Sequence, residues 1–263
     1  MARRHLEGIL AHARATAAAL RPRRRELERA AAGASPAPEF AAALVGPTVG
    51  MIAELKRRSP SAGVINPSMA LDQRARLYAD AGAAAISVLT DEPSFGGSLD
   101  DLELVVATVS VPVLRKDFLL AEEQLLEARA AGASAALLIA RVLPGPALER
   151  LVCFATDAEL DVLVEVHDAP ELDRALDSGA RIIGVNCRDL DTFDLHRDRA
   201  GELLSAVPAD RIAVAESGIR SAEDVMAAAA FGADAVLVGT ALSAATDPAQ
   251  LAESLARVPR RGR

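Results

Sequence analysis

Lysine is the residue whose distribution in this chain points most directly to chemistry. The 263 residues include 29 lysines and arginines, of which only Lys56 and Lys116 are lysines. Arginine is permanently charged, whereas burial or a neighbouring cation can lower the lysine pKa from about 10.4 and turn the ammonium into a proton donor. Both lysines follow apolar runs, VGMIAEL and VPVLR. Either one alone could be a solvated surface charge, but the pair indicates a shared catalytic site.

Three carboxylates occupy matching positions at the ends of apolar runs, namely Glu54, Glu165 and Glu216. Side chains two apart on a strand point the same way, so Glu54 and Lys56 should face one space. A buried carboxylate is costly unless it is paired or transfers protons. The alternative is a set of inert ion pairs at the rim of the fold.

The elements that must position these side chains are visible in an internal repeat. Four segments share an Ala-rich stretch, a Gly-Ala pair and an apolar run, and their glycines are spaced by 50, 47 and 53 residues: Gly82, Gly132, Gly179 and Gly232. This pattern predicts a helix, a left-handed glycine cap and a buried strand. One β/α unit takes roughly 25 residues, so each interval should hold two units. The intervening strands are expected at 111–115, 160–166 and 211–217, after a first strand at 49–55.

The repeat therefore predicts an α/β fold, a (β/α)8 TIM barrel with an N-terminal helical extension. We expect one domain over 1–263, with capping helices at 1–48 and the barrel at 49–257. An open doubly wound sheet or two half-sized domains would also alternate strands and helices, but no GxGxxG loop follows the first strand and no linker divides the chain. In a TIM barrel the active site forms where the strands end, and all the ionisable residues above lie there.

Two short loops after the last two strands predict a phosphate site. AESGIRS contains Ser217 and Gly218, and VLVGTAL contains Gly239 and Thr240. Backbone N–H groups at a helix start bind phosphate well, and loops after strands seven and eight of a TIM barrel often do so. The alternative is that Ser221 and Thr240 are ordinary helix caps.

Composition narrows the class of protein. The net charge of −8 argues against a nucleic-acid binder but leaves room for an anionic small substrate. The two cysteines and four histidines have no spacing typical of a metal site or a disulfide framework, and no apolar run reaches about 18 residues. The arginine-rich N-terminus only weakly resembles a transit peptide. We expect a cytoplasmic protein with no metal.

The sequence closely resembles the indole-3-glycerol-phosphate synthase family. The resemblance covers about 190 residues and rests on seven stretches in order: IAELKRRSPSAG, SVLTDEPSFGGSLDDL, VPVLRKDF, LVEVHD, GVNCRDLDTF, AESGIRS and VLVGTAL. It implies a carboxy-lyase of tryptophan biosynthesis that acts on 1-(2-carboxyphenylamino)-1-deoxyribulose 5-phosphate. Ring closure, loss of carbon dioxide and loss of water then give the indole without a cofactor.

The resemblance also implies roles for individual residues. Lys116 would be the general acid, Glu165 the acid/base of dehydration, and Lys56, held by Glu54, the ligand of the substrate carboxylate. Asn186 would orient the intermediate. Further substrate contacts are implied at Ser59, Phe95, Phe118, Arg188, Glu216, Ser217, Gly218, Gly239 and Thr240.

The sequence departs from the family pattern at Cys187, where a second Asn is usual, and in the final loop, where GTALS replaces GESLM. These changes bear on phosphate geometry rather than on proton transfer. Another phosphate-binding barrel would be expected to use a Cys/Asp or paired-Asp set, and a non-catalytic barrel would not need Lys116 and Glu165 in full motif context. We expect a monomer that binds a phosphorylated small molecule.

Overall fold

Eight parallel strands close into a single barrel in the computed structural model, which describes residues 2–59, 63–64, 69–189 and 194–262. Their order is β1-β10-β9-β8-β7-β6-β5-β4, and β1 pairs with β4 to complete the ring. The strands are β1 Gly50–Leu55, β4 Ala85–Leu89, β5 Val113–Lys116, β6 Ala135–Ile139, β7 Asp161–Val166, β8 Ile182–Asn186, β9 Ile212–Glu216 and β10 Ala235–Val238. The predicted TIM barrel is confirmed. A small hairpin, β2 Arg58–Ser59 with β3 Gly63–Val64, was not predicted.

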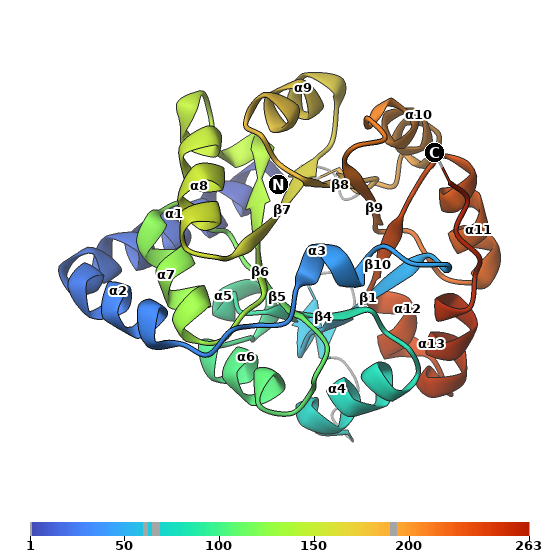
Figure 1. Ribbon diagram of the computed structural model, residues 1–263, viewed down its shortest axis with the longest axis horizontal. Helices are drawn as coiled ribbons and strands as arrows, with labels where there is room; N and C mark the ends of the chain where they lie inside the picture. The colour runs from blue at the N-terminus through green and yellow to red at the C-terminus, as the bar shows by residue number, and fades with distance from the viewer. Residues whose placement is uncertain (1, 60–62, 65–68, 190–193, 263) are drawn as a thin grey trace.

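Helices surround the barrel (Figure 1). The longer ones are α4 Leu71–Asp80, α6 Leu99–Val106, α7 Glu122–Ala130, α8 Pro146–Asp157, α9 Ala169–Asp177, α10 Arg197–Ala206, α11 Ala222–Ala230 and α13 Pro248–Ala256; the short ones are α5 Glu92–Phe95, η2 Ala140–Val142 and α12 Thr240–Ala244. The four glycines of the repeat all have positive φ, as their predicted role as caps requires.

Strand alternation divides the buried residues between two cores. Side chains on the outer face of the strands pack beneath the helices, for example Ala53, Val88 and Leu138. Side chains on the inner face fill the barrel, for example Ile52, Leu114 and Leu163. Because the inner set is aliphatic along the lower part of each strand, the barrel is filled and polar groups are left to the strand ends.

The N-terminal extension has two different roles. The helix α3, Phe40–Ala43, lies across the centre of the ring in Figure 1 and adds Phe40 and Leu44 to the inner core. The helices α1 Ala2–Leu20 and α2 Arg24–Gly33, joined by η1 Arg21–Arg23, pack instead on the outer wall against α7 and α8. Of the N-terminal helices that the structure describes, α3 is therefore the one that closes the end of the barrel at which the strands begin.

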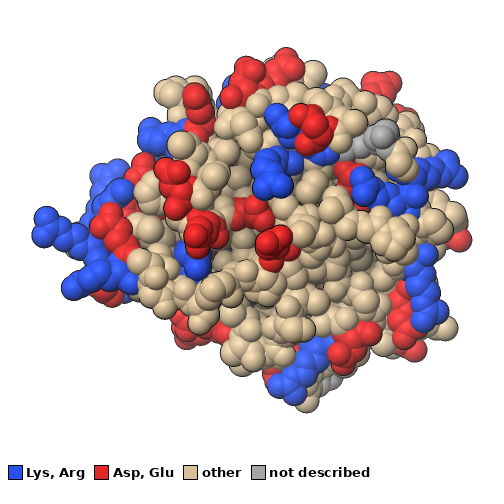
Figure 2. Space-filling model, viewed as in Figure 1, with Lys and Arg blue, Asp and Glu red and all other residues tan. Residues whose placement is uncertain are grey.

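The surface below and to the right of the centre is largely uncharged in Figure 2, charged side chains of both signs lie above and to the left of it, and basic side chains gather at the end of the molecule where α2 lies. They belong to an arginine-rich stretch that includes the exposed Arg21, Arg23 and Arg25. Among the described residues, no helix combines the length and apolar character needed to cross a membrane.

Candidate active site

Lys56 and Glu54 form a buried ion pair at the end of β1. The Lys56 ammonium lies 2.9 Å from Oε1 of Glu54, and each side chain is only 8% exposed. The same ammonium donates a hydrogen bond of 3.1 Å to Oγ1 of Thr240, at the start of α12. The strand alternation that placed Glu54 and Lys56 on one face therefore also brings them to the loop after β10.

Lys116, at the end of β5, lies between two carboxylates from the opposite side of the barrel. Its Nζ is 3.4 Å from Oε2 of Glu165 on β7 and 3.2 Å from Oε2 of Glu216 on β9. Both carboxylates are almost fully buried, and the lysine side chain is 14% exposed. Asn186, at the end of β8, hydrogen-bonds Glu165.

The two lysines belong to one electrostatic site. Burial raises the pKa of Glu54, but the charges of Lys56 and Lys116 outweigh burial, so the pKa of this carboxyl is below its usual range. Because β1 and β5 are parallel strands of one closed barrel and both lysines stand at the C-terminal ends of these strands, the two lysines occupy one mouth of the barrel rather than opposite sides of the molecule.

Glu165 and Glu216 both contact the Lys116 ammonium, but their carboxyl groups have different pKa values. Burial raises the pKa of Glu165, but Lys116, His167 and Asn186 outweigh it and hold that pKa well below its ordinary value. For Glu216, burial and the neighbouring Glu165 charge prevail over Lys116 and raise its pKa to about 8. Two carboxylates this close do not both ionise readily, so Glu165 carries the charge and Glu216 keeps a proton at neutral pH.

The expected lowering of the lysine pKa is wrong for Lys116. Burial lowers the Lys116 pKa, but Glu216, Glu165 and Glu54 together raise it well above its usual value. The ammonium is therefore fully protonated before substrate binds. Sequence spacing identified the carboxylates but did not indicate that three of them would act on one lysine.

Two glycines on inward-facing positions make room for the carboxylates. A Cβ on Gly184 of β8 would lie 2.0 Å from Oε1 of Glu216, and one on Gly239 would lie 2.2 Å from Oε1 of Glu54. Any side chain at either position would displace a carboxylate of the site. Gly239 had been predicted as a phosphate ligand, whereas no sequence signal distinguished Gly184 from a packing residue.

The turn after β9 has an unusual backbone. Ser217 has φ of +66° and Gly218 has φ of +75°, and a left-handed serine is uncommon outside functional sites. Ser221 precedes α11, but its side chain makes no capping hydrogen bond. The Thr240 hydroxyl accepts from Lys56 instead of capping α12. Neither residue behaves as the ordinary cap that the alternative reading required.

The other residues predicted to contact the substrate follow the strands or lie in the helix and hairpin beyond them. Phe118 follows β5 and packs against the inner core, and Phe95 ends α5. The backbone N–H of Arg188 donates to the Asn186 side chain at 3.0 Å. Ser59 ends β2, but its side chain lies outside the described residues.

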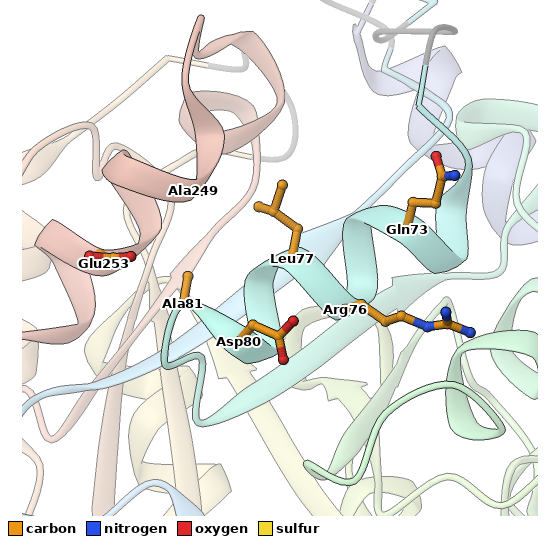
Figure 3. A pocket seen from close by; sticks show the side chains of 7 residues that line it. All are labelled: Gln73, Arg76, Leu77, Asp80, Ala81, Ala249 and Glu253. Atoms are coloured by element: carbon orange, nitrogen blue, oxygen red, sulfur yellow. The ribbon is translucent and has the colours of Figure 1, made fainter.

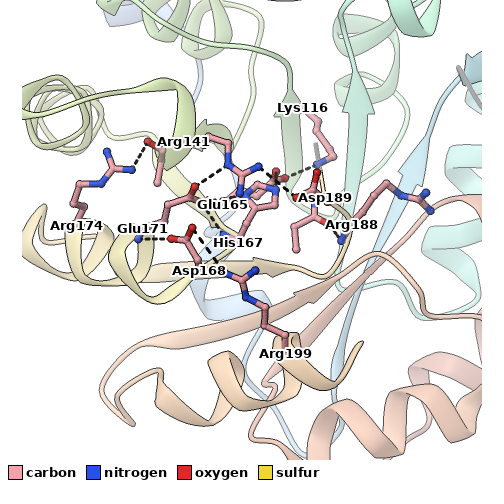
Figure 4. A network of polar contacts seen from close by, with 12 residues as sticks. Lys116, Arg141, Glu165, His167, Asp168, Glu171, Arg174, Arg188, Asp189 and Arg199 are labelled. Atoms are coloured by element: carbon pink, nitrogen blue, oxygen red, sulfur yellow. Dashed lines mark hydrogen bonds and ion pairs between the residues drawn. The ribbon is translucent and has the colours of Figure 1, made fainter. Parts of the chain in front are cut away.

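A polar network behind Glu165 was not assigned from the sequence (Figure 4). His167 follows β7, with Nε2 3.3 Å from Oε1 of Glu165 and Nδ1 3.0 Å from Oε2 of Glu171. Arg141 donates from Nε to Glu171 at 2.9 Å. His167 and Arg141 stand at strand ends, which was a usable signal, but Glu171 lies inside α9 and gave none.

Two surface pockets lie among the helices that surround the barrel. One is on the outer wall between α4 and α13, lined by Gln73, Arg76, Leu77, Asp80, Ala81, Ala249 and Glu253 (Figure 3). The other lies between α10 and α11 and reaches Glu216, Ser217 and Gly218. Within the described ranges, no group of three or more His, Cys, Asp and Glu side chains could hold a metal ion.

Comparison with known proteins identifies the family. The model of the family described as indole-3-glycerol phosphate synthase matches residues 6–255. The chain is 48% identical to the indole-3-glycerol phosphate synthase of Mycobacterium ulcerans over 85% of this chain and 82% of that protein. It is 50% identical to indole-3-glycerol phosphate synthase 1 of Streptomyces coelicolor over 85% of this chain and 83% of the relative.

Solved structures at lower identity support the fold alone. Thiamine phosphate pyrophosphorylase from Pyrococcus furiosus superposes with a TM-score of 0.60 at 17% identity, over 78% of this chain and 93% of that one. For 3-hexulose-6-phosphate synthase from Salmonella typhimurium the TM-score is 0.60 at 18% identity, over 80% and 97%. With its family match over nearly the whole length and about half of the aligned residues identical in these relatives, the chain belongs to the indole-3-glycerol phosphate synthase family.

Proposed function

We propose that the charged mouth carries out the family's carboxy-lyase reaction through Lys116 and Glu165. The activity is that of indole-3-glycerol phosphate synthase in tryptophan biosynthesis. The substrate is 1-(2-carboxyphenylamino)-1-deoxyribulose 5-phosphate. Its carboxylate-bearing ring carbon attacks the ketone carbon, the carboxylate leaves as carbon dioxide to restore the aromatic ring, and the resulting hydroxyl leaves as water.

Lys116 supplies the proton for the first bond. As the carbon–carbon bond forms, negative charge develops on the ketone oxygen, and Nζ donates a proton to it. The raised pKa of Lys116 keeps this proton in place until substrate arrives. Binding that draws Lys116 away from the Glu165 carboxylate weakens a charge interaction that raises this pKa, so the ammonium becomes more acidic when it must donate.

Glu165 completes the dehydration. The hydroxyl departs with a second donated proton, and the Glu165 carboxylate accepts the proton whose loss makes the new five-membered ring aromatic. Two protons are donated and one is recovered, so one proton per turnover comes from solvent. The separation of 3.4 Å between Lys116 Nζ and Glu165 Oε2 supports direct return of the recovered proton to the acid.

Lys56 binds the carboxylate that is lost. Its ammonium is held by Glu54 and Thr240 and is aimed into the same mouth, where it pairs with the substrate carboxylate and is placed to donate the second proton. Asn186 and Arg188 orient the intermediate beside Glu165. Because rearomatisation favours decarboxylation, proton transfer and positioning are sufficient and no cofactor is required.

The phosphate is held by the loops after β9 and β10. The left-handed turn at Ser217 and Gly218 and the start of α12 at Gly239 and Thr240 supply backbone N–H groups. The family resemblance adds Ser59 as a further ligand of the phosphate. Phe95 and Phe118 form the walls for the aromatic ring. We further propose that residues 1–263 form one domain that acts as a monomer in the cytoplasm.

One observation carries the proposal: Lys116 lies between Glu165 and Glu216 in the mouth that Lys56 also enters. The test is the absorbance change of indole formation with purified protein and the anilino substrate. Lys116→Arg keeps the charge but cannot donate, so kcat should fall ~10²-fold or more. Full activity of this variant would remove the role assigned to Lys116. Arg115→Lys is no control, because Arg115 holds the local structure; Arg257→Lys, at the exposed residue that follows α13, is suitable.

A further inference from the structure

His167 follows Glu165 by two residues, and its side chain faces the same space. The ring is 4% exposed, and its Nε2 lies 3.3 Å from Oε1 of Glu165. The other oxygen of that carboxylate, Oε2, faces Lys116. Among the described residues, Nε2 has no partner with hydrogen-bond geometry, so its contact with Oε1 of Glu165 is an ion pair.

The imidazole is fixed from behind by Glu171. Oε2 of Glu171 accepts from the backbone N–H of His167 at 2.8 Å and lies 3.0 Å from its Nδ1. Glu171 is held in turn by Arg141, which donates from Nε to Oε1 at 2.9 Å. The Asp168 side chain caps α9 by accepting from the Glu171 backbone N–H. Hydrogen bonds from β7, η2 and α9 thus hold the Glu171 carboxylate, and this carboxylate fixes the orientation of the imidazole ring (Figure 4).

The charges around His167 favour its protonated form. Glu165 of β7 and Glu171 of α9 flank the ring. Arg141 of η2 pairs with Glu171, and its Nη1 lies 3.8 Å from Asp189 in the loop after β8. Lys116 and Glu216 lie beyond Glu165. Burial lowers the His167 pKa, but the two flanking carboxylates raise it to about 9.

We infer that His167 is a positioning residue that holds Oε1 of Glu165 and so directs Oε2 toward Lys116 and the reacting substrate. The inference rests on the proposed acid–base role of Glu165. A carboxylate with only one fixed oxygen rotates about its last bond, and small misplacements of an acid–base group are costly to the rate. Here Glu165 is the base, and the buried carboxylate of Glu171 orients the imidazole of His167. A buried carboxylate orients an imidazole in the same way in the catalytic triads of other enzymes.

Two substitutions test the contacts of the two ring nitrogens separately. His167→Asn keeps a donor near the position of Nδ1 for Glu171 but has no group that reaches Glu165. His167→Gln places a donor near the position of Nε2. We expect kcat to fall ~10- to 100-fold in His167→Asn, with KM within about threefold, and to recover in part in His167→Gln.

The dependence of kcat on pH distinguishes positioning from packing. In His167→Asn the Glu165 carboxylate loses a cationic neighbour, so its pKa rises and the acid limb of kcat should move up by ~1 pH unit. Glu171→Gln removes one of the charges that raise the His167 pKa, so the alkaline limb should move to lower pH. A residue that only packed would change the melting temperature and leave both limbs in place.

The controls keep this inference separate from the proposed function. His12→Asn makes the same change on the exposed face of α1 and should alter nothing. If folded His167→Asn retained wild-type kcat and acid limb while Glu165→Gln was inactive, the inference about His167 would be overturned and the role of Glu165 would stand. Should His167→Asn not fold, an unmoved alkaline limb in Glu171→Gln would overturn it. Wild-type activity in Glu165→Gln would instead defeat the proposed function itself.

Discussion

Two levels of the same barrel differ in chemistry although they are built by the same strands. On β1, β5, β7 and β9 an inward aliphatic residue is followed, two positions later, by an inward ionisable one: Ile52 and Glu54, Leu114 and Lys116, Leu163 and Glu165, Val214 and Glu216. The lower member joins the core closed by α3, and the upper member joins the charged mouth. One step of alternation thus separates stability from catalysis, and substitutions at the two levels should affect different measurements.

The largest effect on activity is expected at the upper level, from Glu165→Gln. The amide keeps the shape of the side chain but cannot accept a proton, so kcat should fall ~10²- to 10⁴-fold. Lys116 keeps its contact with Glu216, and the pKa of Glu216 falls once the Glu165 charge is gone, so the ammonium still has a carboxylate partner in the folded variant. Indole formation by absorbance measures the first effect, and urea unfolding measures the second. A variant that lost stability in proportion to activity would show that the two levels are not separable.

The matching substitution at the lower level is Leu163→Ala, two residues before Glu165 on β7. Leu163 is fully buried in the inner core, so the truncation should lower the free energy of unfolding by ~2–5 kcal/mol through lost burial and the cavity left behind. Below its melting transition, the folded variant should keep kcat within about twofold. A loss of kcat comparable to that of Glu165→Gln would mean that packing at the lower level positions the acid–base groups directly.

The sequence was sufficient to predict the fold because alternation and the repeat are both local signals. The glycine spacing located the paired β/α units, and the residues that end each strand were read off directly. The charge pair Glu54–Lys56 follows from period two alone. The family resemblance then supplied roles that spacing could not.

What the sequence did not predict depends on contacts between strands. That Lys116 would be surrounded by Glu54, Glu165 and Glu216 is set by barrel closure, which joins residues up to 100 positions apart. The division of the N-terminal helices between an end cap and the outer wall likewise depends on tertiary packing. Gly184 looked like an ordinary strand residue because its neighbour Glu216 comes from β9.

Gly184→Ala tests that neighbour contact at the upper level. The new methyl would lie 2.0 Å from Oε1 of Glu216, so the carboxylate must move and carry Lys116 with it. We expect kcat to fall roughly 10- to 100-fold, the scale of an ångström-sized displacement of a catalytic group. Gly33→Ala, where nothing lies within 4 Å of the added carbon, is the matched control. Unchanged kcat in folded Gly184→Ala would show that Glu216 can move without disturbing Lys116.

The smallest expected effect is on the pH dependence of the free energy of unfolding, and it concerns the carboxyl group of Glu216 at the upper level. Folding raises the pKa of Glu216 from 4.5 to about 8, so the folded protein binds a proton that the unfolded chain has lost. The stabilisation from this group is complete below pH 4.5 and disappears as the pH rises through about 8. In Glu216→Gln this dependence is absent.

The free energy of unfolding of the native chain, measured relative to Glu216→Gln, should therefore fall by ~1–2 kcal/mol between pH 6 and pH 8. Taking the difference matters because His167, whose pKa is raised to about 9, also loses stabilisation as the pH rises, and it does so in both proteins. Glu103→Gln, on the exposed face of α6, should follow the native chain at every pH. A difference that stayed constant from pH 6 to pH 8 would mean that Glu216 is already ionised at neutral pH, and that the charged mouth holds two carboxylates against Lys116 instead of one.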